Sequence, residues 1–280
     1  KYEETIKKVD NMMRNLGTGS PETVAQAEEV VGDMVDLFMD DTDAAVHLMD
    51  AKAADEGLYY HALNVSVVSL MIGKQVGLSK EEMNILGMGA MFHDIGKNKI
   101  EKSILRRPPS QLTKPERQIL LLHPQYGLEM VAKAPNFPKD AGEVILAHHE
   151  RMNGKGYPKK LEGMEIVKTA RICAIADIFD NLCNHPEIAK TLTPYEALSV
   201  MFTKYKDLLD MEIFPMFIKS VGVYPPGTVV VLNNETLGLV VSANPEKPTQ
   251  PSVILYDPEV PKNEAMIFDR PYRLSAPFDA

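Results

Sequence analysis

The chain has no tryptophan, only two cysteines in 280 residues, and no apolar run long enough to cross a bilayer. Cys173 and Cys183 cannot provide the set of disulfides that holds small secreted domains together. Because both lie in apolar surroundings, we expect reduced core thiols in a cytoplasmic protein. A membrane-spanning helix needs roughly 20 consecutive apolar residues. The sequence has neither such a run nor a signal peptide, so we expect no membrane segment in this chain.

Positive charge is also scarce, because 30 lysines and arginines stand against 39 acidic residues, giving a net charge of −9. Proteins that bind DNA or RNA polymers without sequence preference need a basic face. We therefore expect no nucleic-acid polymer as a partner. A small anionic substrate remains compatible, since a local basic pocket can exist on an acidic protein. The chain begins with Lys1, and we expect further sequence upstream of it.

Apolar periodicity predicts helices over most of the first 210 residues. The first carries apolar residues on one face, and it is either a packing helix or the end of a coiled stalk; these residues are Tyr2, Ile6, Val9, Met13 and Leu16. Pro21 after Ser20 predicts the start of the next helix. Further helices are predicted over 42–54, 58–76, 80–93, 114–122, 125–133, 138–150, 166–184 and 194–209.

The pattern changes near Val221, where a turn cluster rich in proline and glycine begins. Short β-branched segments then predict strands over 228–232, 237–242 and 252–256. We therefore predict a mainly α fold in three parts. These are an N-terminal helical segment over 1–54, a central domain over 55–220, and a small β-rich C-terminal extension over 221–280.

Six of the seven histidines lie between residues 61 and 185. Five of them, with two aspartates, interrupt or end apolar runs: His61, His93, Asp94, His123, His148, His149 and Asp177. A single histidine at a helix end is well explained by the helix dipole. Seven such groups near apolar segments are not, because buried imidazoles and acids cost free energy unless they are paired or metal-bound. Imidazole and carboxylate together suit zinc, iron, manganese or nickel, so the sequence predicts a metal centre.

The order and spacing of these residues resemble the HD-GYP domain family. The matching motifs are His93-Asp94 with Gly96-Lys97, then His123, His148-His149-Glu150-Arg151, Gly156-Tyr157-Pro158 and Asp177. The resemblance runs from about Tyr59 to Thr193, and the start of the β tail is also similar to family members. It implies a helical HD-superfamily bundle, a centre of two or three metal ions that are often iron, and hydrolysis of cyclic di-GMP. The products would be linear pGpG and, on further hydrolysis, GMP.

The resemblance also implies which residues bind the metals. Two sites would share Asp94 as a bridge: one with His61, His93 and Asp177, the other with His123, His148 and His149. Family members with a third metal carry glutamate four residues before the first histidine, and this chain has Gly57 there. We therefore expect two divalent ions, with iron as the first choice and manganese, nickel and zinc as alternatives. Two such ions activate a bridging hydroxide and hold the phosphate oxygens.

Substrate contacts are expected beside this centre. Asp94 and Lys97 are the catalytic candidates, because the HD-x-GK spacing implies a positive charge near the scissile phosphate. The alternative interpretation of Lys97 is a solvated lysine after a helix end, without a role in catalysis. Tyr157 is expected to stack on a guanine or to bond a phosphate. Arg151 and Lys155 either hold phosphate or stay solvated.

One segment departs from the family pattern. After Asp180, members usually continue with ALTSxRPYK, whose arginine and lysine hold the dinucleotide phosphates, whereas this chain reads NLCNHPEIAK over 181–190. The arginine is missing and Glu187 adds a negative charge, which leaves Lys190 as the candidate phosphate contact. We expect a cyclic di-GMP phosphodiesterase with a weakened hold on its substrate. The alternatives are a hydrolase of another cyclic dinucleotide, or a weakly active nucleotide sensor that docks a GGDEF-domain protein; a homodimer stays open.

Overall fold

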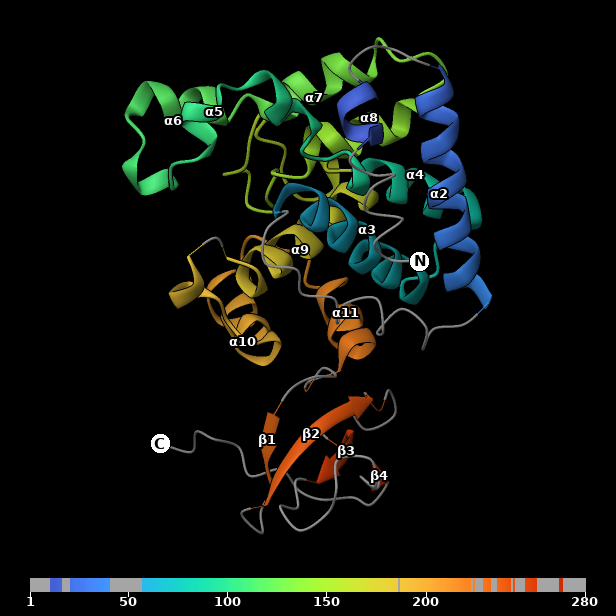
Figure 1. Cartoon of the computed structure of the whole chain (residues 1–280), viewed down its shortest axis with the longest axis vertical. Helices are drawn as coiled ribbons and strands as arrows, with labels where there is room; N and C mark the ends of the chain where they lie inside the picture. Colours follow the sequence, from blue (N-terminus) through green and yellow to red (C-terminus); the bar gives the residue numbers. More distant parts are fainter. Residues whose placement is uncertain are drawn as a thin grey trace.

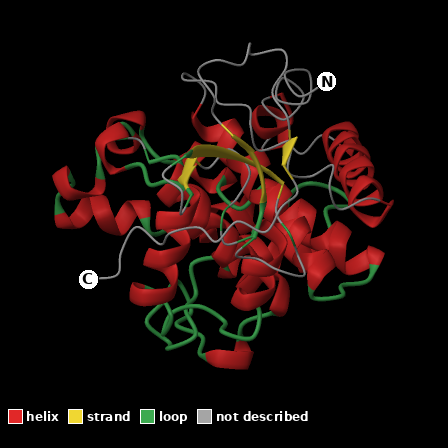
Figure 2. Cartoon of the chain, turned by 90° about the horizontal axis from the view of Figure 1, so that it is seen from below, coloured by secondary structure: helices red, strands yellow, loops and turns green. Residues whose placement is uncertain are grey.

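A computed structural model describes the chain over residues 11–16, 21–40, 57–185, 187–222, 224, 229–232, 236–242, 244, 250–255 and 267–268. Helices form the body, and a small sheet lies beyond the last helix (Figure 1). Figure 2 shows the same division by type of element, seen from below, with the few strands in front of the helices. This confirms the predicted mainly α fold with a C-terminal β appendage.

The helical body is built from α2 to α11, with four short 3-10 turns between them in the described residues. The α-helices are α2 (Pro21–Asp40), α3 (Gly57–Gln75), α4 (Lys80–Met91), α5 (Lys102–Leu105), α6 (Lys114–Leu120), α7 (His123–Val131), α8 (Lys139–Ala147), α9 (Lys168–Cys183), α10 (Pro194–Lys204) and α11 (Phe214–Val221). The 3-10 turns are η3 (Ile95–Lys99), η4 (Pro109–Gln111), η5 (Gly163–Glu165) and η6 (Ile188–Lys190) within the body's loops. Residues 11–16 are also helical.

Local sequence fixes several helix starts. The side chain of Ser79 accepts the backbone N–H of Glu82, whose carboxylate accepts the N–H of Ser79 in return. Thr113 and Thr193 make the same reciprocal bonds at the starts of α6 and α10. Each such cap satisfies two N–H groups that have no partner within the helix.

The core joins helices that are distant in sequence. α3 lies at its centre and packs against α4 and α9, while α4 also packs against α8 and α2. The apolar faces of all five helices belong to one continuous cluster of buried residues. Fully burying one such aliphatic side chain contributes roughly 1.5–3 kcal/mol. This packing brings the C-terminal ends of α4 and α8 beside the N-terminal part of α3 and the middle of α9.

The sheet contains β1 (Val229–Val231), β2 (Leu237–Ser242), β3 (Ser252–Leu255) and β4 (Ile267–Phe268) in sequential antiparallel order. Val230 opposes Gly238 and Leu239 opposes Ile254, which fixes the register of the first three strands. Alternate residues of these strands form a separate small core: Val230, Leu232, Val240 and Val253. The stacked rings of Tyr195 and Tyr224, whose centroids are 5.3 Å apart, connect α10 to the segment that leads into the sheet.

The predicted elements differ from the observed ones mainly at their ends. The predicted helix 138–150 ends at Ala147, and the predicted helix 194–209 ends at Lys204. The helices α5 and α11 and the strand β4 were missed, while the helix predicted over 42–54 lies outside the described residues. Cys173 and Cys183 are free, and Cys173 is buried as expected. Within the described part of the chain, every helix is too short or too polar to span a bilayer.

Candidate metal centre

All seven predicted ligand residues converge at one place, although they come from five helices and their ends. His61 lies on α3 and Asp177 on α9, whereas His93 and Asp94 follow α4, His123 begins α7, and His148 and His149 follow α8. They form two groups, each with ligand atoms within 4.8 Å of one another: His61, His93 and Asp177, and Asp94, His123, His148 and His149. These are the two predicted sets, with Asp94 in the second group.

Three of the imidazoles are oriented by backbone carbonyls of the helix that precedes each of them. The Nδ1 atoms of His93, His123 and His148 lie 2.7, 2.8 and 2.7 Å from the carbonyl oxygens of Ala90, Leu120 and Ile145, each three residues earlier. A carbonyl oxygen can only accept, so Nδ1 carries the proton in each ring. A neutral ring then has an unprotonated Nε2 with its lone pair directed into the cluster.

The Nε2 atoms face one another in pairs. His93 Nε2 is 3.2 Å from His61 Nε2, and His123 Nε2 is 3.3 Å from His148 Nε2. In the His123–His148 pair both Nε2 atoms carry lone pairs, which repel at this separation unless a cation lies between or beside them. Asp94 is a second sign that the cluster suits a cation, because its buried Oδ1 has no hydrogen-bond partner. That oxygen lies 3.2 Å from His123 Nε2.

Burial and neighbouring charges hold most groups of the cluster in the protonation state that binds a cation. Burial lowers the pKa values of His123, His148 and His149, so these rings are neutral near pH 7. Although burial opposes its ionisation, the ammonium group of Lys97 and the nearby imidazoles hold the pKa of Asp94 well below its usual range. Burial also opposes ionisation of Asp177, but its hydrogen bond with His61 lowers the pKa of that carboxyl. Neutral imidazoles and ionised carboxylates form a donor set suited to a divalent metal.

His61 differs from the other imidazoles. Burial favours its neutral form, but hydrogen bonds with Asp177 and Asp180 outweigh burial and raise the pKa of His61 to about 10. In the metal-free protein a proton on His61 therefore compensates the two carboxylates. A metal ion must displace that proton when it binds.

Asp180 is a functional residue that the sequence analysis did not assign. Its buried Oδ2 accepts a hydrogen bond from His61 Nδ1 at 2.7 Å, while Oδ1 accepts from Asn64 and Asn184 at 3.0 and 2.8 Å. This carboxylate fixes the Nδ1–H tautomer of His61 and directs its Nε2 at the cluster. The available signal was its spacing of three from Asp177, which places both acids on one face of α9.

The short turn after Asp94 brings Lys97 onto the centre. Lys97 Nζ donates a hydrogen bond to Asp94 Oδ2, and this carboxylate raises the pKa of Lys97 despite the opposing effect of burial. The turn packs closely on α7, because a Cβ added to Gly96 would lie only 1.9 Å from the carbonyl oxygen of His123. Glycine is therefore required where the turn contacts the backbone of α7.

The loop after His149 is held by Glu150, a second residue that was quoted in a motif but given no role. Its buried carboxylate accepts backbone N–H groups from Lys159, Lys160 and Leu161 at 2.6, 3.1 and 3.1 Å. Gly156 lies directly on the same backbone, since an added Cβ would be 2.4 Å from the Glu150 Cα. The loop thus folds back over the end of α8 and forms one edge of the cluster.

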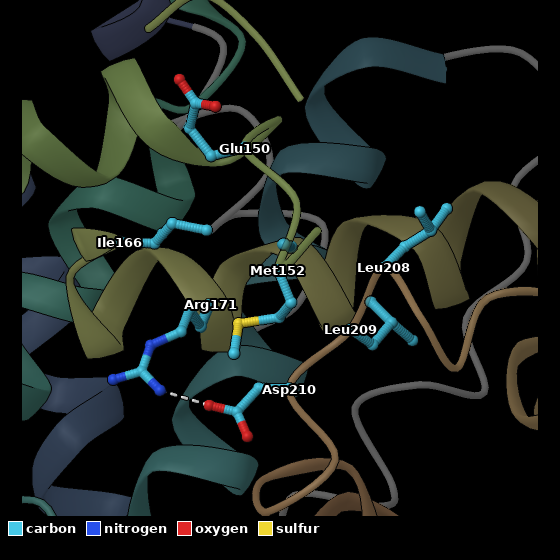
Figure 3. Close-up of a pocket in the computed structure, with 8 residues that line it drawn as sticks. Glu150, Met152, Ile166, Arg171, Leu208, Leu209 and Asp210 are labelled. Carbon is cyan, nitrogen blue, oxygen red and sulfur yellow. Dashed lines mark hydrogen bonds and ion pairs between the residues drawn. The ribbon is translucent and has the colours of Figure 1, made fainter. Parts of the chain in front are cut away.

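The outer end of this loop is supported by a buried ion pair. Arg171 on α9 binds Asp210, and both line a small cavity with Met152 and Leu208 (Figure 3). The backbone N–H of Met152 donates to the carbonyl of Leu208 at 3.0 Å. The carboxylate of Glu150 points away from this ion pair (Figure 3). None of the seven cluster residues lines this cavity, so the cavity is separate from the candidate centre.

Comparison with known proteins identifies the family. Residues 44–213, more than half of the chain, match the family model of the HD domain. The chain belongs to the HD domain family. It is 29% identical over 248 residues to the cyclic di-GMP phosphodiesterase PA4108 of Pseudomonas aeruginosa, covering 89% of this chain and 59% of that protein. It is 37% identical over 147 residues to the cyclic di-GMP phosphodiesterase response regulator RpfG of Xanthomonas campestris, covering 52% and 39%.

A solved structure has the same fold as this HD domain protein. Bd1817, an HDG"Y"P protein from Bdellovibrio bacteriovorus, superposes with a TM-score of 0.66 at 19% identity, covering 77% of this chain and 68% of that one. The resemblance to HD-GYP domains found in the sequence is confirmed. The chain spans 59% and 39% of the lengths of the two curated relatives.

The residues of the HD domain that were predicted to contact substrate differ in their surroundings. The ring of Tyr157 stacks on His149 with centroids 4.7 Å apart, so one of its faces is already covered by an imidazole. Arg151 Nη1 donates to the carbonyls of His148 and Glu150 at 3.2 Å, which turns the guanidinium onto the backbone of the loop. Lys155 is exposed on the same loop.

The departing segment of the HD domain neutralises its own charge. Lys190 Nζ lies 2.8 Å from a carboxylate oxygen of Glu187, and both side chains are largely exposed. His185 Nδ1 accepts the backbone N–H of Glu187 at 3.0 Å. The structure gives neither Lys190 nor His185 a contact with the seven-residue cluster, and the positive charge of Lys190 is shared with an acid on its own turn.

Proposed function

We propose that this chain is a metal-dependent phosphodiesterase that hydrolyses cyclic di-GMP to linear pGpG, with GMP as the product of any further hydrolysis. One observation carries the proposal: the Nε2 atoms of four imidazoles and an unpartnered carboxylate oxygen face one another inside an HD domain. Such an arrangement needs a cation for its own electrostatic balance. The names of the curated relatives support a cyclic dinucleotide as the substrate.

We assign two divalent ions to this centre, with iron as the first choice. Asp94 would bridge them, since its Oδ2 lies 3.5 Å from His93 Nε2 and its Oδ1 lies 3.2 Å from His123 Nε2. Gly57, four residues before His61, offers no side chain for a third ion. When bound, such a pair of ions supplies a nucleophilic water at neutral pH and stabilises charge on the phosphate.

The protein's own groups bind and orient the substrate in this proposal. Lys97 provides a fixed positive charge next to Asp94, where a phosphate approaching the centre gains charge in the transition state. The loop held by Glu150 forms the edge against which the nucleotide rests, with Tyr157 and Lys155 toward the substrate. We assign catalysis to residues 55–220 and place the reaction in the cytoplasm.

A second candidate substrate is another cyclic dinucleotide. The observation that favours it is the ion pair between Glu187 and Lys190, which weakens the segment expected to hold the phosphates of cyclic di-GMP. A charge-assisted hydrogen bond to phosphate contributes on the order of 1.5–3 kcal/mol, so its loss reduces binding roughly tenfold to a hundredfold. We therefore expect slow but measurable turnover of cyclic di-GMP.

The test is anaerobic purification followed by elemental analysis and chromatography of the products from cyclic di-GMP, cyclic di-AMP and 3'3'-cGAMP. We expect about two ions per chain and a linear dinucleotide product. Asp94→Asn is the inactive control, because it removes the charge that both ions share. Tight binding of cyclic di-GMP without cleavage by the metal-loaded protein would show that the chain is a sensor. Efficient cleavage of a different cyclic dinucleotide alone would replace the substrate and keep the mechanism.

A further inference from the structure

Asn181 makes direct contact with one of the candidate metal ligands. It follows Asp177 by one turn of α9, and its Nδ2 lies 2.6 Å from Asp177 Oδ1 and 2.8 Å from the Asp177 backbone oxygen. Both of these oxygens only accept hydrogen bonds, so the amide nitrogen, and not the amide oxygen, faces them. Asn181 therefore uses both of its N–H groups on a single residue.

The oxygen that Asn181 contacts belongs to one half of the cluster. Asp177 Oδ1 lies 3.3 Å from His61 Nε2 and 3.8 Å from His93 Nε2, whereas Oδ2 lies 3.8 Å from His149 Nδ1. An ionised carboxylate oxygen has two lone pairs. Asn181 occupies one of them, which leaves the other for an ion shared with His61 and His93. The carboxylate cannot rotate without breaking this bond.

Through this contact with Asp177, the first residue of the segment 181–190 acts on the candidate metal ligands and not on the phosphates of the substrate. Asn181 is exposed, so it contributes little to the core, yet its amide reaches a carboxylate that is only 3% exposed. Hydrogen bonds to ligating carboxylates orient them, and losing such an outer partner typically lowers metal affinity 10–100-fold. The other group of ligands contains Asp94 and three imidazoles, and Asn181 has no hydrogen bond to any of these in the described structure.

We propose that Asn181 is a positioning residue that sets the affinity of the ion held by His61, His93 and Asp177, and leaves the second ion unaffected. The inference rests on the metal centre of the proposed function. It does not depend on which cyclic dinucleotide is hydrolysed.

Titration of Mn²⁺ into the metal-free full chain by calorimetry tests this. We expect two classes of site in the wild type, and a Kd for one class that rises about 10–100-fold in Asn181→Ala. Asn181→Leu keeps the bulk of the side chain without the donor, and we expect the same loss. Asn84→Ala is the matched control, because Asn84 Nδ2 also donates to a carbonyl four residues earlier, that of Lys80 at 2.9 Å, but contacts no ligand.

Turnover provides a second measurement. Because Asn181 acts on affinity, saturating Mn²⁺ is expected to restore the kcat of Asn181→Ala to that of the wild type. Unchanged affinity, equal weakening of both classes, or lost turnover that excess Mn²⁺ does not restore would each overturn the role of Asn181. If the wild type binds Mn²⁺ in two classes but cleaves no cyclic dinucleotide, the proposed function fails while the role of Asn181 stands. A wild type that binds no Mn²⁺ overturns both.

Discussion

Replacing Asp180 with asparagine isolates the effect of one carboxylate on the orientation of His61. Asp180 is 4% exposed, and it accepts three hydrogen bonds, from His61, Asn64 and Asn184. An asparagine of the same shape has one acceptor oxygen and two N–H donors. If its oxygen serves Asn64 and Asn184, its NH2 group faces His61 Nδ1. His61 must then carry its proton on Nε2, and the lone pair points away from the cluster.

The opposite orientation of the new amide is no better, because its NH2 group would meet the NH2 groups of Asn64 and Asn184. Either arrangement removes a charge-assisted hydrogen bond, so we expect the metal-free protein to lose about 1.5–3 kcal/mol of stability. Loss of an outer partner of a ligating histidine lowers metal affinity about 10–100-fold, which corresponds to about 1.4–2.7 kcal/mol. The loss of metal affinity is separate from the loss of folding stability, because it comes from the changed orientation of His61.

The assay is Mn²⁺ calorimetry on the metal-free protein, combined with thermal denaturation in a chelator. Asp210→Asn is the matched control, because Asp210 is equally buried and pairs with Arg171 but has no contact with the cluster. We expect both variants to lose stability and only Asp180→Asn to lose Mn²⁺ affinity. Wild-type affinity in Asp180→Asn, or equal losses of affinity in the two variants, would refute the reasoning.

Three further predictions follow from the same geometry. Glu150→Gln replaces one acceptor oxygen with an NH2 group, so at least one backbone N–H of the loop, that of Leu161 in the better orientation, loses its acceptor. We expect KM for the dinucleotide to rise about tenfold at unchanged metal content, measured by initial rates and elemental analysis. Lys97→Ala removes a charge but no ligand, so kcat should fall by about 10²–10³ with both ions retained; loss of the ions would contradict this role. Because the folded pKa of His61 is raised to about 10, its stabilisation of the metal-free fold is complete below about pH 6.5 and is lost as the pH rises toward 10. Thermal denaturation in a chelator over this range should show that loss, and Mn²⁺ affinity should increase over the same range as the competing proton leaves.

The sequence alone determined the character of the fold and the membership of the candidate centre. Apolar spacing of three and four residues predicted α3, α4 and α9 to within two residues, because amphipathic periodicity is a local property of the chain. Histidines and aspartates at the ends of apolar runs pointed to a metal centre because burying such groups without a partner is costly. The structure brings the same seven residues together.

Only the tertiary structure decided how those residues are oriented and which neighbours support them. His61 and Asp180 are 119 positions apart, and no local pattern predicts that one fixes the tautomer of the other. From the sequence, Asn181 was only one residue of the segment that departs from the family pattern. It contacts Asp177 because one turn of α9 places its amide there. The two-residue strand β4 has too few residues to show a periodicity. Hydrogen bonds of this kind depend on directions and distances between helices, which core packing sets and which the order of residues along the chain does not encode locally.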